Sequence, residues 1–523
     1  MVTTVRERDG VEREALLSSG AMYNESPGVV CVDKGMDAFV DRVGMNRFHY
    51  VLIGTLGLAN LGDATEIISM GYIIASKTFT DEFGDNDDEK RSLTVSIFFG
   101  MLFGGLLVSV LGDNKIGRRP LLLASLLINA IAGVLAAMSP SLWMITVFRS
   151  IAGVGVGGSV PCLWTLGAEL TPPARRGYLL TIIGWFWMVG SIVTSVLAIL
   201  ILNTMHLSWR VFSFTCAMPS VVCFILVLFY IPESPRYLLV KQRFEETAAA
   251  LNWIASYDSA QQHITDEELI EHHNSMNPPL SRSALGEDTS GFGVTTAFAS
   301  FYRQVKSVYG SIKYRRTLLL LQSLWFCLSF SNYGLITWIE TVFKKIGVTN
   351  PFLAAFFFAA GSLPGNILST WLIETVGRRS VMIWSMALGA ALLLAFAGQV
   401  ANDLTGTETP SVVLIVITAA LFNGCATASW NALDVMSSET FPTSVRSTVI
   451  GLQSSSGRVG AMVAQLVNAT LSSYPFRLLV VAAITMVFGV IATGKLPDMK
   501  GKQLDDVMID GEKTSDDDER TDE

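Results

Sequence analysis

Twelve apolar stretches, each close to the length that a helix needs to cross a lipid bilayer, dominate this sequence of 523 residues. Each helical residue adds about 1.5 Å, so about 20 of them span the hydrocarbon core. Half of the residues are hydrophobic and only 16% are charged, which excludes an ordinary soluble protein. The sequence therefore predicts an all-α membrane protein with twelve transmembrane helices. The stretches lie near residues 48–74, 93–112, 120–139, 141–166, 178–202, 210–231, 317–341, 351–374, 381–400, 411–436, 446–470 and 475–496.

Basic residues indicate which ends of these helices face the cytosol. Lys and Arg are enriched in cytosolic loops. In a twelve-span arrangement the mainly acidic segment DEFGDNDDEKR falls on one side, and four segments with an excess of basic residues fall on the other: DNKIGRRP, PARRG, VGRRS and TSVRS. Residues 1–46 have no apolar core of the kind a cleavable signal peptide requires. We therefore expect a multi-pass protein of the plasma membrane or of an endosomal, vacuolar or vesicle membrane, with both termini in the cytosol.

Two short charged motifs occur once in each half of the chain. IGRRP follows the second stretch and VGRRS follows the eighth. ELTPPARRG follows the fourth stretch and ETFPTSVRS follows the tenth, with Glu, Pro and Arg at the same spacing. The offsets between copies are 260 residues (378 minus 118) and 270 residues (439 minus 169). The chain therefore contains two six-helix halves in the same orientation, which is typical of transporters that rock two bundles about a central site.

This repeat divides the chain into five parts. We expect a cytosolic N-terminal tail, an N-terminal six-helix bundle, a cytosolic central loop, a C-terminal six-helix bundle and a disordered acidic cytosolic tail. Within the central loop, residues 234–256 predict an amphipathic helix that braces the two halves. The five parts are residues 1–46, 47–231, 232–316, 317–496 and 497–523.

The charged residues of the motifs are predicted to form a cytosolic gate. Arg and Glu at the inner helix ends can pair across the two bundles and hold that side closed. The alternative is that these residues only satisfy the enrichment of basic residues in cytosolic loops. The predicted gate residues are Arg118, Arg119, Glu169, Arg176, Glu374, Arg378, Arg379, Glu439 and Arg446.

With these motifs, residues 45–496 resemble the major facilitator superfamily. The stretches FRSIAGVGVGGSVP, AELTPPARRG and IPESPRYLL point to its branch of sugar-porter-like and synaptic-vesicle-related organic-ion transporters. The resemblance implies two pseudo-symmetric bundles and transport by alternating access. The chain departs from the pattern at Asn114, where the family usually has Asp, with Asp113 one step early. The resemblance therefore does not extend to this position of the first gate motif.

Two carboxylates in the first apolar stretch need an explanation. Asp63 and Glu66 are three residues apart, so they share one face of a helix. A charge at the bilayer centre costs about 2.5–3.5 kcal/mol on insertion scales. Arg149 lies at a depth similar to that of Asp63, which predicts an Asp63–Arg149 pair and leaves Glu66 free to bind and release a proton. The alternative is a purely structural charge network between the first and fourth helices.

Substrate-binding candidates lie on other helices. Arg458 is expected near mid-membrane, where it could attract an anionic substrate or hydrogen-bond to neighbouring helices; the sequence identifies no partner for it. Aromatic rings can stack on a planar solute or face a cation. Trp187, Tyr333 and Asn431 are therefore predicted to line the substrate cavity, although packing alone would also explain such residues.

The sequence gives no support for catalysis, nucleotide binding or metal binding. No Gly-rich nucleotide loop, nucleophile–base set or metal-ligand spacing is evident, so we expect neither an enzyme nor a cofactor, metal or nucleic-acid partner. EREALL has the form of an acidic dileucine signal, Glu12 with Leu16 and Leu17, which a sorting adaptor could bind. The partners expected are thus a small-molecule substrate, protons and the lipid bilayer, with the adaptor as a further possibility.

The sequence as a whole predicts a secondary active transporter of a small organic ion or nutrient, coupled to protons. Two alternatives stay open. One is proton-independent facilitated diffusion of a neutral solute such as a sugar, and the other is a vesicle-membrane interaction protein that does not transport.

Overall fold

The computed structural model describes residues 29–84, 86–112, 116–258, 264–276, 294–405, 411–441 and 443–496. The chain divides into two compact units, one of residues 1–44 and 235–286 and a larger one of residues 45–234 and 287–523. Glu12, Leu16, Leu17, Asp113, Asn114 and the acidic tail 497–523 lie outside the described residues.

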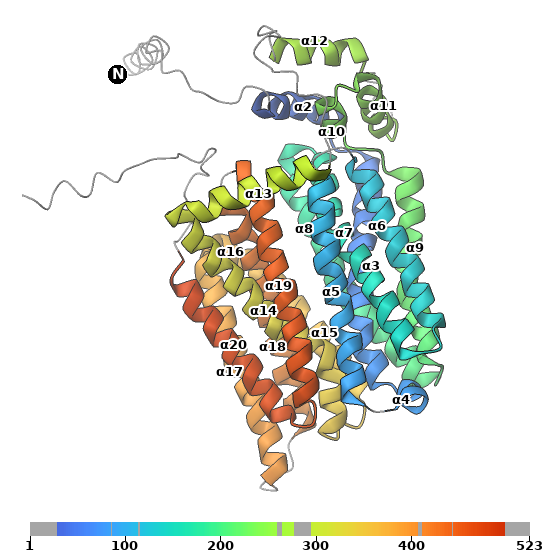
Figure 1. Ribbon diagram of the computed structural model, residues 1–523, viewed down its shortest axis with the longest axis vertical. Coiled ribbons are helices and arrows are strands. Elements are labelled where there is room, and N and C mark those ends of the chain that lie inside the picture. The colour runs from blue at the N-terminus through green and yellow to red at the C-terminus, as the bar shows by residue number, and fades with distance from the viewer. Residues whose placement is uncertain are drawn as a thin grey trace, which may run out of the picture. The chain divides into compact units, whose positions relative to one another are not determined.

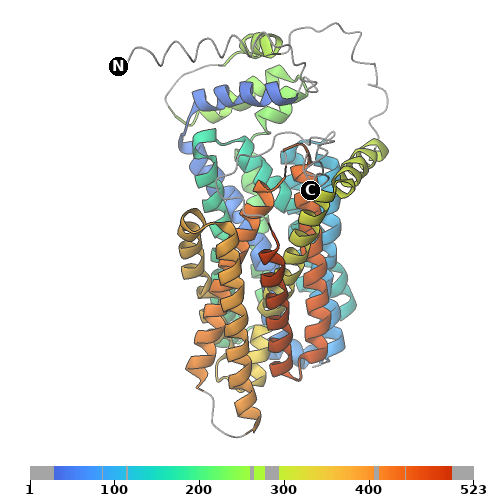
Figure 2. The ribbon, with the colours of Figure 1, turned by 90° about the vertical axis from the view of Figure 1, so that its left-hand side faces the viewer.

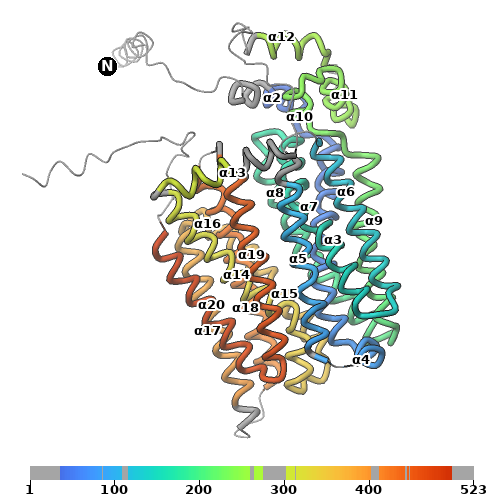
Figure 3. The backbone as a smooth tube through the Cα atoms, viewed as in Figure 1, coloured from blue at the N-terminus to red at the C-terminus, as the bar shows by residue number. Residues whose placement is uncertain are grey.

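The larger unit is built from long helices that run side by side in two groups (Figures 1 and 3). The N-terminal group contains α3 (Arg47–Ala75), α4 (Lys77–Phe83), α5 (Asp87–Gly112), α6 (Arg118–Met138), α7 (Leu142–Glu169), η1 (Pro173–Arg175), α8 (Arg176–Ala198), η2 (Ile199–Thr204) and α9 (Trp209–Tyr230). The C-terminal group contains α14 (Ile312–Lys345), α15 (Pro351–Ala360), α16 (Ser362–Thr375), α17 (Arg378–Thr405), α18 (Val412–Glu439), α19 (Thr443–Leu471) and α20 (Pro475–Gly494). Every predicted apolar stretch is helical, and the eighth is interrupted at Gly361, so the predicted all-α fold of two six-helix bundles is confirmed.

Eleven of the described helical segments are long and apolar enough to cross a membrane. The predicted eleventh span is α19, which has 29 residues but carries the polar sequence QSSSGR in its middle. This helix packs against α14 of its own bundle and against α5 of the other. Its polar residues therefore lie on a helix that contacts both bundles.

We name the two ends of the larger unit by the charges of their loops. The basic end is where α5 ends and α6 begins, and where α16 ends and α17 begins. The acidic end carries α4 and the end of α14, and α4 marks it in Figure 1. Near the basic end, α13 (Val294–Gly310) contacts α5, α14 and α19, and thus both bundles.

Local sequence sets several helix ends. Asn46 and His49 form a capping box at the start of α3, which satisfies backbone N–H groups that the first turn leaves unpaired. Ser76 ends α3 and accepts a hydrogen bond from the Phe79 N–H at the start of α4. Gly347 and Gly377 have φ angles of 75° and 102°, which a side chain would resist, so α14 and α16 each end beside a glycine.

Glycines let α5 and α7 approach to backbone contact. A Cβ on Gly153 or Gly157 would lie 2.2 Å from a carbonyl oxygen of α5, and one on Gly104 would lie 2.1 Å from a carbonyl oxygen of α7. The glycines that follow Arg149 therefore allow these two helices to pack closely. Gly365 of α16 meets Gly424 of α18 in the same way in the C-terminal bundle.

The smaller unit contains α2 (Val29–Val43), α10 (Pro235–Val240), α11 (Phe244–Ala255) and α12 (Asp266–Met276) (Figure 2). The prediction of one helix over residues 234–256 was wrong, because Gln242 has a φ of 57° and separates α10 from α11. Leu251 and Leu269 pack with Met36 and Phe39 of α2, a helix that the sequence did not reveal. The role of this segment as a brace stays a prediction.

Candidate functional site

Glu66, and not Asp63, is the partner of Arg149. Arg149 Nη1 donates to Glu66 Oε1 at 2.8 Å and to the Glu66 carbonyl oxygen at 2.8 Å. Arg149 Nη2 also donates to Ser69 Oγ at 3.3 Å. Glu66 and Arg149 are 2% and 1% exposed, so this is a fully buried ion pair. The predicted Asp63–Arg149 pair was therefore wrong.

The positions of these residues along their helices explain why Arg149 pairs with Glu66 and not with Asp63. Arg149 lies seven residues from the start of α7, about 10 Å from the acidic end at about 1.5 Å per residue. Glu66 lies nine residues from the end of α3, about 13 Å, whereas Asp63 lies about 18 Å from it. Glu66, which lies one turn closer to the acidic end than Asp63, is therefore nearer to the depth of the Arg149 guanidinium.

Asp63 is left with a neutral partner. Its Oδ2 accepts a hydrogen bond of 2.6 Å from Ser159 Oγ on α7. Its Oδ1 is buried and has no hydrogen-bond partner in the described part of the chain. Arg458 of the other bundle acts on Asp63 electrostatically. Asp63, and not Glu66, is therefore the carboxylate of this helix with a free oxygen.

Arg458 connects the two bundles. Its guanidinium lies over the Tyr333 ring, 5.8 Å from the centroid. It also interacts electrostatically with Asp434 on α18 and with Asp63 on α3. Arg458 is only partly buried, and Asp434 is exposed although it lies within the helical part of α18. The partner that the sequence could not identify is thus the Tyr333 ring, and Asp63 and Asp434 interact with Arg458 electrostatically.

Aromatic side chains from both bundles meet at Tyr333. Phe98 and Trp187 of the N-terminal bundle have ring centroids 5.5 and 6.4 Å from that of Tyr333. Trp430 of the C-terminal bundle lies 5.8 Å away and donates through Nε1 to Asn332 Oδ1. We call Phe98, Trp187, Tyr333 and Trp430 the aromatic cluster. The predicted residues Trp187 and Tyr333 belong to it, while Phe98 was not predicted.

Asn431 has a different environment. Its Nδ2 donates to Asn366 Oδ1 and to Ser369 Oγ, both at 2.7 Å, and both residues lie on α16. The amide nitrogen therefore joins α18 to α16 within the C-terminal bundle. Nothing in these contacts supports the predicted place of Asn431 in the substrate cavity.

The predicted gate residues form the same contacts in each half of the chain. Arg118 of α6 pairs with Glu169 of α7 at 3.5 Å, and Arg378 of α17 pairs with Glu439 of α18 at 3.0 Å. The second arginine of each motif donates to the end of the last helix of its bundle: Arg119 to the Leu228 carbonyl oxygen and Arg379 to that of Gly494.

The other predicted gate residues make contacts near their own helix ends. Arg378 also lies 3.5 Å from Glu374, and Arg446 donates to the Phe441 carbonyl oxygen at 3.4 Å. Arg176 begins α8.

These ion pairs join helices within one bundle. In this conformation Arg118–Glu169 and Arg378–Glu439 do not pair across the two bundles, and such pairing in another conformation stays a prediction. The reason is that each arginine begins a helix that packs directly against the helix whose end carries the glutamate, α6 against α7 and α17 against α18. The repeated motif therefore ties each bundle together at the basic end.

Removing one such pair should have a small effect on stability. Arg378 and Glu439 are 19% and 32% exposed, so solvent screens their attraction, and we expect Glu439→Gln to lower the free energy of unfolding by about 1 kcal/mol or less. Thermal unfolding in detergent measures this. The matched control is Glu374→Gln, whose side chain is 73% exposed, and it should change nothing measurable. A loss as large as that of a buried pair would contradict this assignment.

Comparison with known proteins supplies the family. The model described as "Sugar (and other) transporter" matches residues 65–510. The chain belongs to this family, within the major facilitator superfamily. The transporter is 25% identical to the niacin transporter NiaP of Acinetobacter baylyi over 87% of this chain and 97% of that protein. It is 28% identical to solute carrier family 22 member 6 of Bos taurus, over 86% and 76% of the two chains. Synaptic vesicle glycoprotein 2B of Mus musculus is 23% identical over 95% and 90%.

Solved structures share the fold. The partially occluded inward-open form of the xylose transporter XylE from E. coli has a TM-score of 0.65 at 16% identity, covering 87% of this chain and all of that one. The proton:xylose symporter XylE bound to 6-bromo-6-deoxy-D-glucose has a TM-score of 0.64. This transporter is thus a multi-pass membrane protein that moves a sugar or an organic ion, and is not an enzyme.

Proposed function

We propose that this transporter moves a small planar organic anion together with a proton by alternating access. The observation that carries the proposal is Arg458, whose guanidinium lies over Tyr333 in the aromatic cluster. Arg offers a fork of N–H donors that matches a carboxylate, and the neighbouring rings can stack on a planar body. The cluster takes residues from both bundles, so movement of the bundles would open and close it around a substrate.

Contacts between the bundles support alternating access. At the acidic end, Tyr72 of α3 stacks on Phe352 of α15 with ring centroids 6.0 Å apart. α8 and η2 contact α15, which begins at the acidic end, whereas α8 contacts α16, which ends at the basic end, far less. Along α8, this difference is what a state closed at the acidic end and more open at the basic end would produce. With the basic end placed in the cytosol, as the loop charges predict, the state is inward-facing.

Asp63 is the proposed proton carrier. It is fully buried, one of its oxygens has no hydrogen-bond partner among the described residues, and Arg458 attracts it electrostatically. A substrate carboxylate that paired with Arg458 would weaken the attraction between Arg458 and Asp63, which favours the protonated form of Asp63. Anion binding and proton binding would then support each other.

One of the relatives supports this substrate class. The name of the niacin transporter describes a carrier of an aromatic carboxylic acid, which the aromatic cluster and Arg458 suit chemically. The neutral alternative is a sugar, since the family and the solved structures include xylose transporters. In that case Arg458 and Asp63 would be structural, and uptake would not respond to a proton gradient.

The experiment is radiolabelled uptake into proteoliposomes with and without an imposed pH gradient. The panel compares nicotinate and other aromatic acids with nicotinamide, a carnitine-like cation, a hexose and phosphate. We expect an aromatic carboxylate to accumulate only with the gradient, and its uncharged amide not to compete. Gradient-independent uptake of the hexose, with no uptake of any carboxylate, would overturn the proposal.

Arg458→Lys should weaken carboxylate uptake while leaving the protein folded. Lysine retains the charge but loses the two-pronged geometry, and a charge-assisted hydrogen bond contributes about 1.5–3 kcal/mol, so we expect the apparent affinity to fall by about tenfold or more. Competition by unlabelled substrate measures this. Arg477→Lys is the matched control, because that arginine lies over Tyr474 near the acidic end. Equal loss in both variants would contradict a substrate role for Arg458.

The division into five parts, the cytosolic position of both termini and the sorting-adaptor site stay proposals of the same kind. Each follows from loop charge or sequence pattern alone.

A further inference from the structure

A third buried carboxylate lies between the bundles, away from Asp63 and Glu66. Glu340 of α14 is 1% exposed, and its Oε2 has no hydrogen-bond partner in the described part of the chain. It lies against Gly71 of α3, where a Cβ would be 2.7 Å from Glu340 Oε2 and 2.7 Å from the Thr337 carbonyl oxygen. Glu340 is thus enclosed at a contact between the N-terminal and C-terminal bundles in the half nearer the acidic end.

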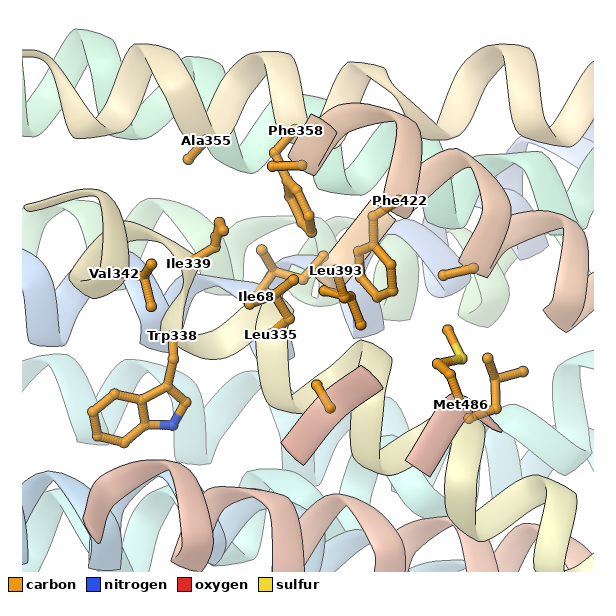
Figure 4. Packing of buried hydrophobic residues seen from close by; sticks show 14 of the residues in the cluster. Ile68, Leu335, Trp338, Ile339, Val342, Ala355, Phe358, Leu393, Phe422 and Met486 are labelled. Carbon is orange, nitrogen blue, oxygen red and sulfur yellow. The ribbon is translucent and has the colours of Figure 1, made fainter. Parts of the chain in front are cut away.

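Apolar side chains seal this contact. Figure 4 shows Ile68 of α3 close to Leu335, with Ile339 and Phe358 beside them. One turn beyond Glu340, Lys344 Nζ donates to the Ala75 carbonyl oxygen at the end of α3, at 3.3 Å. α3 and α14 therefore meet along several turns, with Glu340 inside the contact.

Among the described residues, no cation pairs with Glu340. The titratable side chain that interacts with it there is Tyr72 of α3, whose hydroxyl also bonds Ser195 Oγ of α8 at 2.7 Å. Cys216 of α9 acts on Tyr72, and from α15 the uncharged Phe352 stacks on the Tyr72 ring. Lys344, on the same helix, points its ammonium at Ala75 instead. A carboxylate buried without a counter-charge is very unfavourable, whereas a carboxylic acid is tolerated there.

Opening the acidic end must change this environment. If the bundles separate at that end, the contact between Gly71 and Glu340 breaks and water reaches the carboxyl. Glu340 can then be ionised at little cost. When the contact closes again, water is excluded and the ionised form is disfavoured.

We propose that Glu340 is a second proton-binding site, which takes a proton from the acidic side each time the α3–α14 contact closes and returns it to that side when the contact opens. This proton is separate from the one assigned to Asp63, because water would reach Glu340 only when the bundles separate at the acidic end. Its effect is to link the conformation of the transporter to the pH of that compartment. The inference rests on alternating access, but not on the identity of the substrate or on proton symport.

The test measures the conformation directly, without substrate. Spin labels at Asp81→Cys on α4 and Ser473→Cys between α19 and α20 report the separation of the bundles at the acidic end, because both positions are exposed. Double electron–electron resonance then gives the ratio of open to closed protein as a function of pH. A site that is protonated when closed and ionised when open changes this ratio by up to about tenfold per pH unit. We expect the open population to rise with pH in the otherwise unchanged protein.

Three variants separate this site from others. Glu340→Gln, which mimics the protonated form, should stay closed at every pH and lose the pH dependence. Gly71→Ala should raise the open population at every pH while keeping the dependence, because its methyl group disturbs the contact but leaves the carboxyl in place. Asp88→Asn, which changes an exposed carboxylate of α5 near the same end, should behave like the parent protein.

Two results would overturn the inference. One is an open-to-closed ratio that does not change with pH in the parent protein. The other is a pH dependence that survives in Glu340→Gln and disappears in Asp63→Asn, which would assign it to the first site. Failure of the proposed symport would appear elsewhere, as uptake insensitive to the proton gradient, and would leave these distances unaffected.

Discussion

Replacing Arg149 by methionine is expected to lower the free energy of unfolding by about 3–5 kcal/mol, since it leaves the Glu66 carboxylate buried without its partner. Glu66 and Arg149 are both almost fully buried, and Arg149 also bonds the Glu66 carbonyl oxygen and Ser69. Methionine fills a similar volume, so the expected loss comes mainly from the isolated charge. Denaturant titration in detergent micelles measures it.

The double variant Arg149→Met with Glu66→Gln isolates that cause. Removing both charges should recover most of the stability, because replacing both members of a buried pair is often neutral. Arg91→Met is the matched control, since Arg91 pairs with Asp88 at an exposed position and should contribute about 0.5 kcal/mol or less. If the double variant were as unstable as Arg149→Met alone, the ion pair would not be the source of the loss.

Asp63→Asn is expected to abolish uphill accumulation while substrate exchange continues. A monovalent anion that moves with one proton carries no net charge, so only the pH gradient drives it, and each pH unit supports about tenfold accumulation. With an imposed difference of two units, the parent protein should accumulate substrate about 100-fold, and Asp63→Asn should reach equal concentrations. Asparagine keeps the size of the side chain and can still bond Ser159, but binds no proton in this range.

Counterflow of labelled against unlabelled substrate shows whether the variant still transports. Asp81→Asn, an exposed position on α4, is the control and should accumulate substrate normally. Undiminished accumulation by Asp63→Asn would remove Asp63 from the coupling step. Glu66→Gln cannot replace this experiment, because it leaves Arg149 buried and unpaired, so its effect mixes coupling with stability.

Much of the candidate site could be found from the sequence because membrane burial makes certain residues conspicuous. Asp63, Glu66, Arg149 and Arg458 stand out since a charge in an apolar stretch needs a reason. Glu340 carries the same signal, in the sequence GLITWIETVF, but lies near the end of its predicted span, where carboxylates are common. Phe98 carries no signal at all, because one phenylalanine among many apolar residues looks like packing.

The sequence predicted the positions of the charged residues better than it predicted their partners. The choice between Asp63 and Glu66 as the partner of Arg149 depends on a difference of one helical turn, about 5 Å, which is smaller than the uncertainty of a span boundary read from the sequence. The gate arginines were placed at the correct helix ends but expected to pair across the bundles. Only the packing of α6 on α7 and of α17 on α18 shows that they pair within each bundle.

The sequence by itself determined the twelve helices, their two repeated halves and the helices that hold buried charge. The reason is that apolar length decides whether a helix can cross the bilayer and loop charge decides its orientation, and both are properties of the chain itself. The tertiary structure decided which charges are neutralised: Arg149 pairs with Glu66, whereas in the described part of the chain no cation is in contact with Asp63 or Glu340. The reason is that the counter-charge of a side chain and its access to water depend on helices distant in the sequence. The offset of these helices along their axes and their rotation cannot be predicted from a local sequence pattern.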